Sequence, residues 1–322
     1  MKHIQVIGGG AIGLLLAGRL AASGVPVTVR TRTGEQAEKL SAEGITIESA
    51  IGGAAIRTAV EASALEAESP ARPALTLLAV KQTALAPAFA APIARAVPPG
   101  SPLAAFCNGI GHTDLLAGWL PGRTILAAVT TEASLRTGPA AVRHTGAGEI
   151  WLGRAPLFEG GREALAEGDE TEAEAVAAVL KQAGFSANVS NDMAKRMLRK
   201  LLNNAVINPL TSLLRIANGE LVRTPERAAV TKRLFDETLG VLSACGLPPE
   251  AGLWEQLLEL CAATAANRSS MLQDVLAGRG TEIAAINGAV ARLAAAKGLP
   301  APLNESVTAL VSALRGTIEK GG

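Results

Sequence analysis

A glycine-rich turn near the amino terminus constrains the fold of this chain more than any other feature. The stretch VIGGGAIG, residues 6–13, places glycines in a G-x-G-x-x-G spacing between an apolar β-type run and a helical run. The first glycine permits a tight turn, the second lets the backbone approach a pyrophosphate, and the third lets the helix pack on the strand. The motif therefore predicts a dinucleotide-binding βαβ unit, against the alternative of a turn that binds nothing. The candidate cofactor-binding residues here are Gly8, Gly10, Ala11, Ile12 and Gly13.

The first half of the chain alternates short β-type runs with helical runs. The β-type runs are residues 3–8, 25–30, 74–80, 102–107 and 124–130, and helical runs cover 11–23, 34–42 and 83–96. This rhythm predicts a mostly parallel sheet covered by helices, an α/β Rossmann-type domain. AAVRHT and GEIWLG predict a hairpin near 140–153, and a helix at 170–183 with a strand at 185–190 completes the unit.

From Asn191 onward the sequence contains helical patterns only. Segments rich in Ala and Leu run near 192–216, 225–245, 250–264, 269–277, 281–297 and 303–318. A chain of 322 residues is long for a single core, so two domains are expected. We predict a Rossmann-type dinucleotide-binding domain at residues 1–190 and an all-helical substrate domain at 191–322.

Composition and charge exclude several classes of partner. Lys and Arg number 30 against 29 Asp and Glu, with no basic block, so we expect no nucleic-acid partner. The longest apolar run, residues 11–22, is too short for a membrane span and contains Arg19, and we recognise no signal peptide. Cys107, Cys245 and Cys261 fit neither a zinc spacing nor a disulfide framework, which predicts no metal site and a reducing cytoplasm.

The residues after the second β-type run bear on the choice of dinucleotide. An NAD site usually has Asp or Glu there to hold the ribose hydroxyls, but this chain has the segment VRTRT with no acid before Glu35. An arginine can instead pair with a 2′-phosphate through its planar fork. We therefore expect NADPH as the cofactor, with Arg32 as the first candidate and Arg30 as the second, unless one or both simply face solvent.

Polar residues also follow two later β-type runs. Lys81 and Gln82 come after residues 74–80, and Asn108 and Gly109 come after residues 102–107. Ligands of open α/β sheets bind outside the carboxyl ends of the strands, so these side chains are placed to meet a nicotinamide ribose or a substrate. A solvated helix start and a plain turn are the alternatives.

The helical segment RKLLNNAVINPLTSLL, residues 199–214, carries an unusual polar stripe. At about 100° per residue, Lys200, Asn204 and Asn208 lie within roughly 80° of one another, spread over about 12 Å. Thr211 shares the stripe, and apolar side chains occupy almost all the remaining arc. Unpaired buried polar groups are costly, so the stripe predicts either a bound polar substrate or pairing with protein or water. Pro209 should open the hydrogen-bond ladder and kink the helix.

Two downstream segments place polar residues at expected helix starts. NRSSMLQDV offers Asn267, Ser269 and Ser270, and GRGTEIAAING offers Thr281 and Glu282. The simplest interpretation is capping, with Ser269 or Ser270 as an N-cap boxed by the later glutamine and Thr281 as another N-cap. Helix starts also bind carboxylates, so capping does not exclude substrate binding.

These motifs together resemble the ketopantoate reductase family over essentially the whole chain. The resemblance rests on GxGxxG, the arginine after the second strand, AVKQ, NGIG, RKLLNNAVINPLT, NGEL at 218–221, NRSSMLQDV and TEIAAING. It implies a Rossmann domain and a helical domain with the active site in the cleft between them, NADPH as cofactor, and 2-dehydropantoate as the small-molecule substrate reduced to (R)-pantoate in pantothenate synthesis. The sequence leaves oligomeric state open, and a homodimer is one assembly that it allows.

The resemblance also implies roles for individual residues. Lys200 matches the proton donor and Glu282 the glutamate near cofactor and substrate. The matching substrate-binding residues are Lys200, Asn204, Asn208, Asn218, Asn267, Ser269 and Ser270, of which Ser270 holds the carboxylate. Lys81 and Asn108 match cofactor-contacting positions, to which Glu282 is added.

This chain departs from the family at two positions. Many relatives have Asp two residues after the matching glutamate, where this chain has Ala284, and some have Gln where this chain has Ala84. Neither change affects the proton donor. The alternatives are an NADPH-dependent reductase of another branched 2-oxo acid and an NADP(H)-binding sensor without catalysis, which would have no use for the lysine–asparagine stripe.

Overall fold

The computed structural model describes residues 3–69, 72–154, 156 and 169–314, and it divides the chain into two compact units. The first unit comprises Met1–Cys107 and His112–Met193, and the second comprises Asn108–Gly111 and Ala194–Gly322. The change of unit at residue 193 lies close to the boundary expected from the sequence at 190. The four residues 108–111, expected in the Rossmann domain, instead group with the helices.

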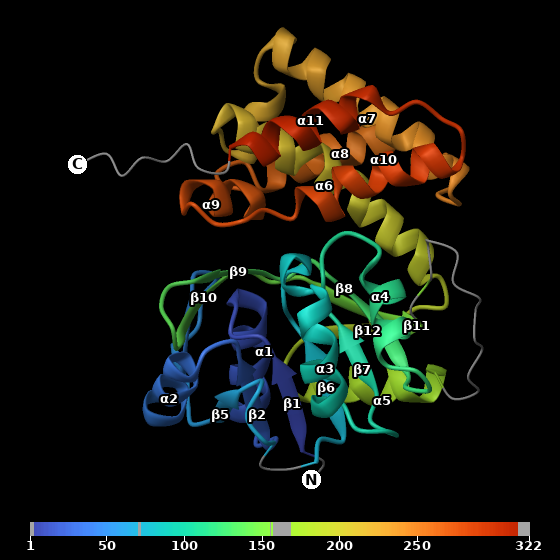
Figure 1. Cartoon of the computed structure of the whole chain (residues 1–322). Helices are drawn as coiled ribbons and strands as arrows, with labels where there is room; N and C mark the ends of the chain where they lie inside the picture. Colours follow the sequence, from blue (N-terminus) through green and yellow to red (C-terminus); the bar gives the residue numbers. More distant parts are fainter. Residues whose placement is uncertain (1–2, 70–71, 155, 157–168, 315–322) are drawn as a thin grey trace. The chain divides into compact units, whose positions relative to one another are not determined.

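The first unit is built on an eight-stranded sheet with the order β12-β11-β8-β7-β6-β1-β2-β5 (Figure 1). All neighbouring pairs are parallel except β8 with β11. The strands are β1 (Ile4–Ile7), β2 (Val27–Thr31), β5 (Glu61–Ala64), β6 (Leu75–Leu78), β7 (Leu103–Ala105), β8 (Ile125–Thr130), β11 (Glu149–Arg154) and β12 (Ser186–Val189). The helices are α1 (Ala11–Ala22), α2 (Gly34–Glu43), α3 (Pro87–Ala96), α4 (His112–Trp119) and α5 (Asp169–Gln182), with a 3₁₀ turn η1 (Gln82–Ala84). This confirms the Rossmann-type α/β class.

The direction in which the sheet grows reverses at β1. The chain runs from β1 to β2 and β5 on one side and then crosses back to β6 on the other side. The carboxyl ends of β1 and β6 therefore meet, and the amide of Ala79 donates to the carbonyl of Ile7 at 2.8 Å. Such a reversal is where open α/β sheets bind ligands. The glycine-rich turn lies at this point.

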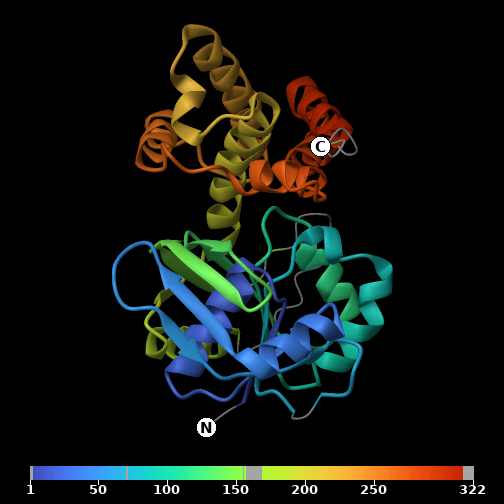
Figure 2. The ribbon, with the colours of Figure 1, turned by 90° about the vertical axis from the view of Figure 1, so that its left-hand side faces the viewer.

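The first unit also contains a second, four-stranded sheet, and the hairpin predicted near residues 140–153 does not form. Its order is β4-β3-β10-β9, formed by β3 (Ile45–Ser49), β4 (Ile56–Thr58), β9 (Ala133–Arg136) and β10 (Ala141–Gly146) (Figure 2). The runs AAVRHT and GEIWLG do form strands, but β10 pairs with β9 and β3 while β11 pairs with β8 and β12. Gly148 lets the chain change sheets, because a Cβ there would lie 2.4 Å from the backbone of Thr131.

Within its described residues, the second unit consists of helices joined by turns and loops, with no strand. It contains α6 (Met193–Leu214), α7 (Pro225–Ala244), α8 (Leu253–Ala263), α9 (Ser270–Leu276), α10 (Asn287–Ala296) and α11 (Pro302–Ala313), with 3₁₀ turns η2 (Asn218–Val222) and η3 (Ile283–Ala285). The helix expected at 281–297 is wrong at its start: Thr281 caps no helix, η3 follows Glu282, and α10 begins only at Asn287. The last residues expected in the helix at 303–318 lie outside the described part. No described helix is both long enough and apolar enough for a membrane span.

The cysteine on α8 gives a direct test of packing in the helical unit. Cys261 is 1% exposed, and burial raises the pKa of its thiol to about 11. Because the thiolate is the nucleophile, about one thiol in a thousand is reactive at pH 8. We expect iodoacetamide at pH 8 to leave Cys261 unmodified in the native protein and to alkylate it in guanidinium chloride, as peptide mass spectrometry would measure. Rapid alkylation in the native protein would contradict this packing.

Candidate functional site

The glycine-rich turn leaves two of its glycines no room for a side chain. A Cβ at Gly13 would lie 1.9 Å from the carbonyl oxygen of Gly8, and a Cβ at Gly8, whose φ is +124°, would lie 2.3 Å from that of Ala79. At Gly10 the nearest atom would be 4.0 Å away, and no side chain caps α1 there. Gly8 and Gly13 thus serve close packing, while Gly10 leaves open space at a helix start suited to an anion.

Two side chains that the sequence did not single out, Gln36 and Arg136, bind the backbone carbonyl of Gly9 in this turn. Gln36 on α2 donates from Nε2 to the carbonyls of Gly9 and Pro139, both at 2.8 Å. Arg136 on β9 donates from Nη1 to the Gly9 carbonyl at 3.2 Å. The turn is therefore tied to α2 and to the small sheet. No local signal marks these residues, because each contact joins segments far apart in the sequence.

The structure distinguishes the two arginines near the end of β2. Arg30 is 2% exposed, and one of its Nη atoms donates to the carbonyls of Ala64 and Leu65 at 3.0 and 3.1 Å, and also to that of Ala67. Burial lowers the pKa of the Arg30 guanidinium. Arg32 is exposed, one residue past the strand. Arg30 thus has a structural role, and Arg32 alone of the two is available to a 2′-phosphate.

The polar residues after β6 surround a short turn. Lys81 is exposed and precedes η1. The neighbouring Gln82 places Nε2 3.1 Å from Nδ1 of His112, which is 1% exposed. Gln82 therefore fixes the start of α4, and Lys81 reaches the surface at the carboxyl end of the sheet.

Asn108 contacts Glu282, although 174 residues separate them. The amide Nδ2 of Asn108 donates to Oε2 of Glu282 at 3.3 Å, and the backbone amide of Ile110 donates to the carbonyl of Ala285 at 3.4 Å. Glu282 is only 6% exposed. The structure thus brings together two predicted cofactor-binding residues, with the Asn108 amide donating to the Glu282 carboxylate.

The polar stripe of α6 has the burial expected from its sequence. Lys200 and Asn204 are half-buried, and Asn208 is 6% exposed. The apolar flanks are buried at Leu201, Leu202, Ala205, Val206, Ile207 and Leu210. Leu214, expected within the apolar arc, is instead 45% exposed at the end of the helix. Lysine and asparagine side chains therefore occupy a narrow stripe on a helix that is otherwise mostly enclosed.

The predicted substrate-binding residues of the helical unit meet in two contacts. Thr211 places its Oγ1 2.7 Å from the Oγ of Ser269, which joins the stripe to the segment before α9. Asn218 donates its backbone amide to the carbonyl of Asn267 at 3.0 Å and its Nδ2 to Thr264 at 3.0 Å. The Oδ1 of Asn218 is buried and has no hydrogen-bond partner.

The start of α9 is capped as predicted, but without the box. The Oγ of Ser269 accepts from the amide of Leu272 at 3.1 Å, which makes Ser269 the N-cap. Gln273 donates instead to the carbonyl of Arg268 at 3.0 Å, so no capping box forms. Ser270 is exposed as the first residue of the helix, which leaves its hydroxyl accessible.

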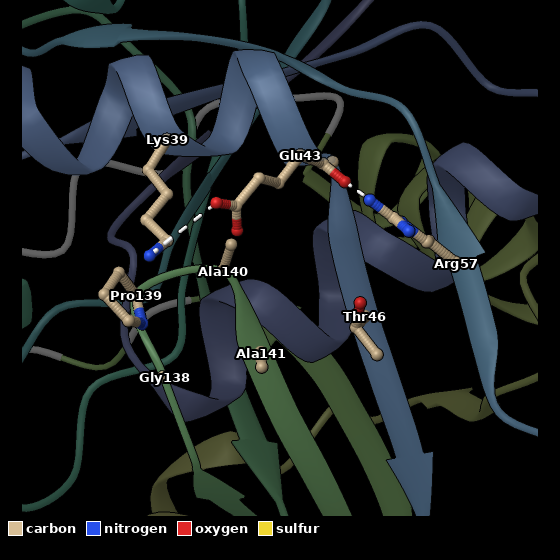
Figure 3. Close-up of a pocket in the computed structure, with 9 residues that line it drawn as sticks. Lys39, Glu43, Thr46, Arg57, Gly138, Pro139, Ala140 and Ala141 are labelled. Carbon is tan, nitrogen blue, oxygen red and sulfur yellow. Dashed lines mark hydrogen bonds and ion pairs between the residues drawn. The ribbon is translucent and has the colours of Figure 1, made fainter.

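A cavity of about 210 Å³ lies elsewhere, between α2 and the small sheet (Figure 3). Its charged side chains pair on its rim: Lys39 lies 3.7 Å from Glu43, and Arg57 donates to the Glu43 carbonyl at 3.3 Å. None of the predicted site residues lines it. This cavity is therefore separate from the predicted cofactor- and substrate-binding residues.

Comparison with known proteins gives matches over both units. Residues 4–156 match the family model "Ketopantoate reductase PanE/ApbA", and residues 192–315 match "Ketopantoate reductase PanE/ApbA C terminal". The chain is 33% identical to the 2-dehydropantoate 2-reductase of Bacillus subtilis, covering 98% of this chain and 99% of the relative.

Solved structures show the same fold. A probable 2-dehydropantoate 2-reductase of Bacillus subtilis superimposes with a TM-score of 0.79 at 32% identity, covering 97% of this chain and 99% of that one. D-mandelate dehydrogenase with NADH and anilino(oxo)acetate has a TM-score of 0.85 at 23% identity, covering 97% and 98% of the two chains, which establishes similarity of fold alone. The chain therefore belongs to the ketopantoate reductase family of oxidoreductases.

Proposed function

We propose that this protein reduces 2-dehydropantoate to (R)-pantoate with NADPH, a step of pantothenate synthesis in the cytoplasm. The observation that carries the proposal is the match to a 2-dehydropantoate 2-reductase along 98% of the chain, which includes the dinucleotide turn and the polar stripe alike. The lysine–asparagine stripe on a mostly enclosed helix supports a polar substrate. The sensor alternative leaves that stripe without a purpose.

The residues of the first unit fit the cofactor. The open space at Gly10 before α1 accommodates a pyrophosphate, and the exposed Arg32 supplies a cation for the 2′-phosphate. Lys81 of the first unit and Asn108, which groups with the second unit, are the further cofactor contacts that we propose. NADPH held by these residues would supply the hydride for C2 of the substrate.

Lys200 has the chemistry required at the substrate carbonyl. As C2 is reduced, negative charge develops on its oxygen and needs a nearby proton or charge-assisted hydrogen bond. An ammonium group provides both, and a carboxylate such as Glu282 favours the protonated lysine. In our proposal Lys200 is the donor, and Glu282 orients it or the substrate.

The remaining polar residues bind the substrate. Asn204, Asn208 and Asn218 hold its hydroxyl and carboxylate oxygens, and Ser270, with Asn267 and Ser269 beside it, holds the carboxylate. The unpartnered Oδ1 of Asn218 supports this assignment, because a buried acceptor without a donor is costly and a substrate hydroxyl can supply one.

The two arginines of β2 provide a matched test of cofactor choice. We expect Arg32→Gln to raise the Kd for NADPH by about 10- to 100-fold, the worth of a charge-assisted contact, and to change NADH binding little. Arg30→Met should instead lower the thermal midpoint, because three backbone carbonyls lose their shared donor. Fluorescence titration of both nucleotides, with thermal unfolding, measures these effects. Weakened NADPH binding in Arg30→Met at normal stability, with Arg32→Gln unaffected, would reverse the assignment.

A substrate panel tests the reaction itself. Purified protein would be given NADPH or NADH with 2-dehydropantoate, other branched 2-oxo acids and an aryl 2-oxo acid. We expect the highest kcat/KM for 2-dehydropantoate with NADPH. A higher value for another 2-oxo acid would identify a different reductase, and nucleotide binding without turnover of any acid would identify a sensor.

A further inference from the structure

Pro209 leaves a gap in the hydrogen bonding of α6. In a helix the amide of residue 209 would donate to the carbonyl of Ala205, but proline has no N–H. The helix nevertheless runs from Met193 to Leu214 across this position. Because the interior carbonyl of Ala205 is buried, it needs another donor.

Asn287, the first residue of α10, supplies that donor. Its Nδ2 donates to the carbonyl of Ala205 at 2.8 Å and to Oδ1 of Asn304 at 2.9 Å. Asn304 in turn donates from its own Nδ2 to Glu237 at 2.9 Å and to Thr238 at 3.1 Å. The amide thus joins three helices, α6, α10 and α11, to a network anchored on α7.

The hydrogen bonds of Asn287 show which part of its side chain matters. The residue is 0% exposed, and its Oδ1 has no partner, while its Nδ2 uses both hydrogens. A buried amide with an unsatisfied oxygen is costly, so an apolar residue would serve packing better. The donor group is therefore what this position requires.

The hydrogen bond between Asn287 and Ala205 lies close in sequence to two parts of the candidate site, the polar stripe and Glu282. Ala205 lies between Asn204 and Asn208 in the sequence of α6, level with the middle of the polar stripe but on the buried apolar side of the helix. Asn287 follows Glu282 by five residues, and the carbonyl of Glu282 accepts from Ala285 and Ile286 at 2.9 and 3.1 Å within that turn. We propose that Asn287 is a positioning residue: its amide replaces the hydrogen bond that Pro209 withholds from Ala205 and thereby fixes the Glu282 segment against the polar stripe of α6.

The hydrogen bond from Asn287 to the Ala205 carbonyl can be tested by protein stability alone, independently of the proposed function. Asn287→Leu keeps the volume and removes the donor, so we expect the thermal midpoint to fall by about 5 °C. Pro209→Ala restores a backbone N–H facing the Ala205 carbonyl. In that background Asn287→Leu should lower the midpoint by less than half as much, as measured by circular dichroism at 222 nm.

Thr238→Val provides the control. It removes a hydroxyl from the same network without touching Ala205, so Pro209→Ala should leave its effect unchanged. Equal losses for Asn287→Leu in both backgrounds would overturn the inference. If Asn287→Leu gives no folded protein by itself, recovery of folded protein in the Pro209→Ala background is the same test, and absence of recovery overturns the inference equally.

The positioning role of Asn287 toward the Glu282 segment rests on the proposed function and is tested by enzyme activity. Pro209→Ala satisfies Ala205 but does not restore the connection to the Glu282 segment. We therefore expect the double variant to regain stability while kcat for 2-dehydropantoate stays about 10-fold or more below that of Pro209→Ala. Activity that returns together with stability would show a purely structural role. If wild-type protein does not turn over 2-dehydropantoate, the proposed function fails, while the stability result still decides the hydrogen bond.

Discussion

Lys200→Ala is expected to lower kcat for 2-dehydropantoate by about 10²- to 10⁴-fold and to leave the Kd for NADPH within a factor of about two. The loss follows from the chemistry, because the variant has no group on α6 that can give a proton to the C2 oxygen as charge develops there. The cofactor contacts that we propose do not include this side chain. Steady-state assays at 340 nm and a fluorescence titration of NADPH measure the two effects separately.

A second lysine of the same helix provides the control for this prediction. Lys195 pairs with Glu250 at 2.5 Å, outside the polar stripe. Lys195→Ala removes an equal charge from α6, and we expect kcat to stay within a factor of about two. Near-normal turnover in Lys200→Ala, or equal losses in both variants, would remove Lys200 from the mechanism.

Alanine substitutions at Gly10 and Gly13 should separate binding from folding. At Gly13 a Cβ would lie 1.9 Å from a backbone oxygen, so we expect a loss of about 3 kcal/mol or more in the free energy of unfolding. At Gly10 the nearest atom would be 4.0 Å away, and the backbone, at φ −83° and ψ −175°, suits any residue. Gly10→Ala should therefore fold normally and bind NADPH about 10-fold or more weakly, because the methyl group occupies the space of the pyrophosphate.

Chemical denaturation and NADPH titration of the two variants give the comparison. A Gly10→Ala protein that binds NADPH as well as wild type would show that the pyrophosphate does not approach this residue. A Gly13→Ala protein of normal stability would show that the turn relaxes easily, and the close packing assigned to Gly13 would be wrong.

Local patterns predicted the features that depend on one segment of chain. The glycine spacing, the alternation of strands and helices, and the helical period of residues 199–214 each follow from neighbours in sequence. The family resemblance then related the stripe to NGEL and to the segments around Ser270 and Glu282. The structure adds contacts among these segments, such as Thr211 with Ser269 and Asn218 with Asn267.

Features that depend on distant partners could not be predicted in this way. β10 and β11 resemble a hairpin because only two residues separate them, and their separation into different sheets depends on β3 and β9, which supply the pairing for β10. The sequence offers both Arg32 and Arg30 as candidates for the 2′-phosphate, ranked in that order, and only the fold shows that Arg30 is buried against carbonyls. The side chain that donates to the Ala205 carbonyl in place of the missing Pro209 amide is 82 residues away in the sequence, at Asn287.

The stoichiometry of NADPH oxidation and pantoate formation tests whether this protein reduces 2-dehydropantoate. Wild-type protein would be incubated with 2-dehydropantoate and NADPH, with NADPH followed at 340 nm and pantoate quantified by mass spectrometry. We expect one pantoate formed for each NADPH oxidised, and loss of both signals in Lys200→Ala. If NADPH binds and no pantoate forms, the protein is not a 2-dehydropantoate reductase.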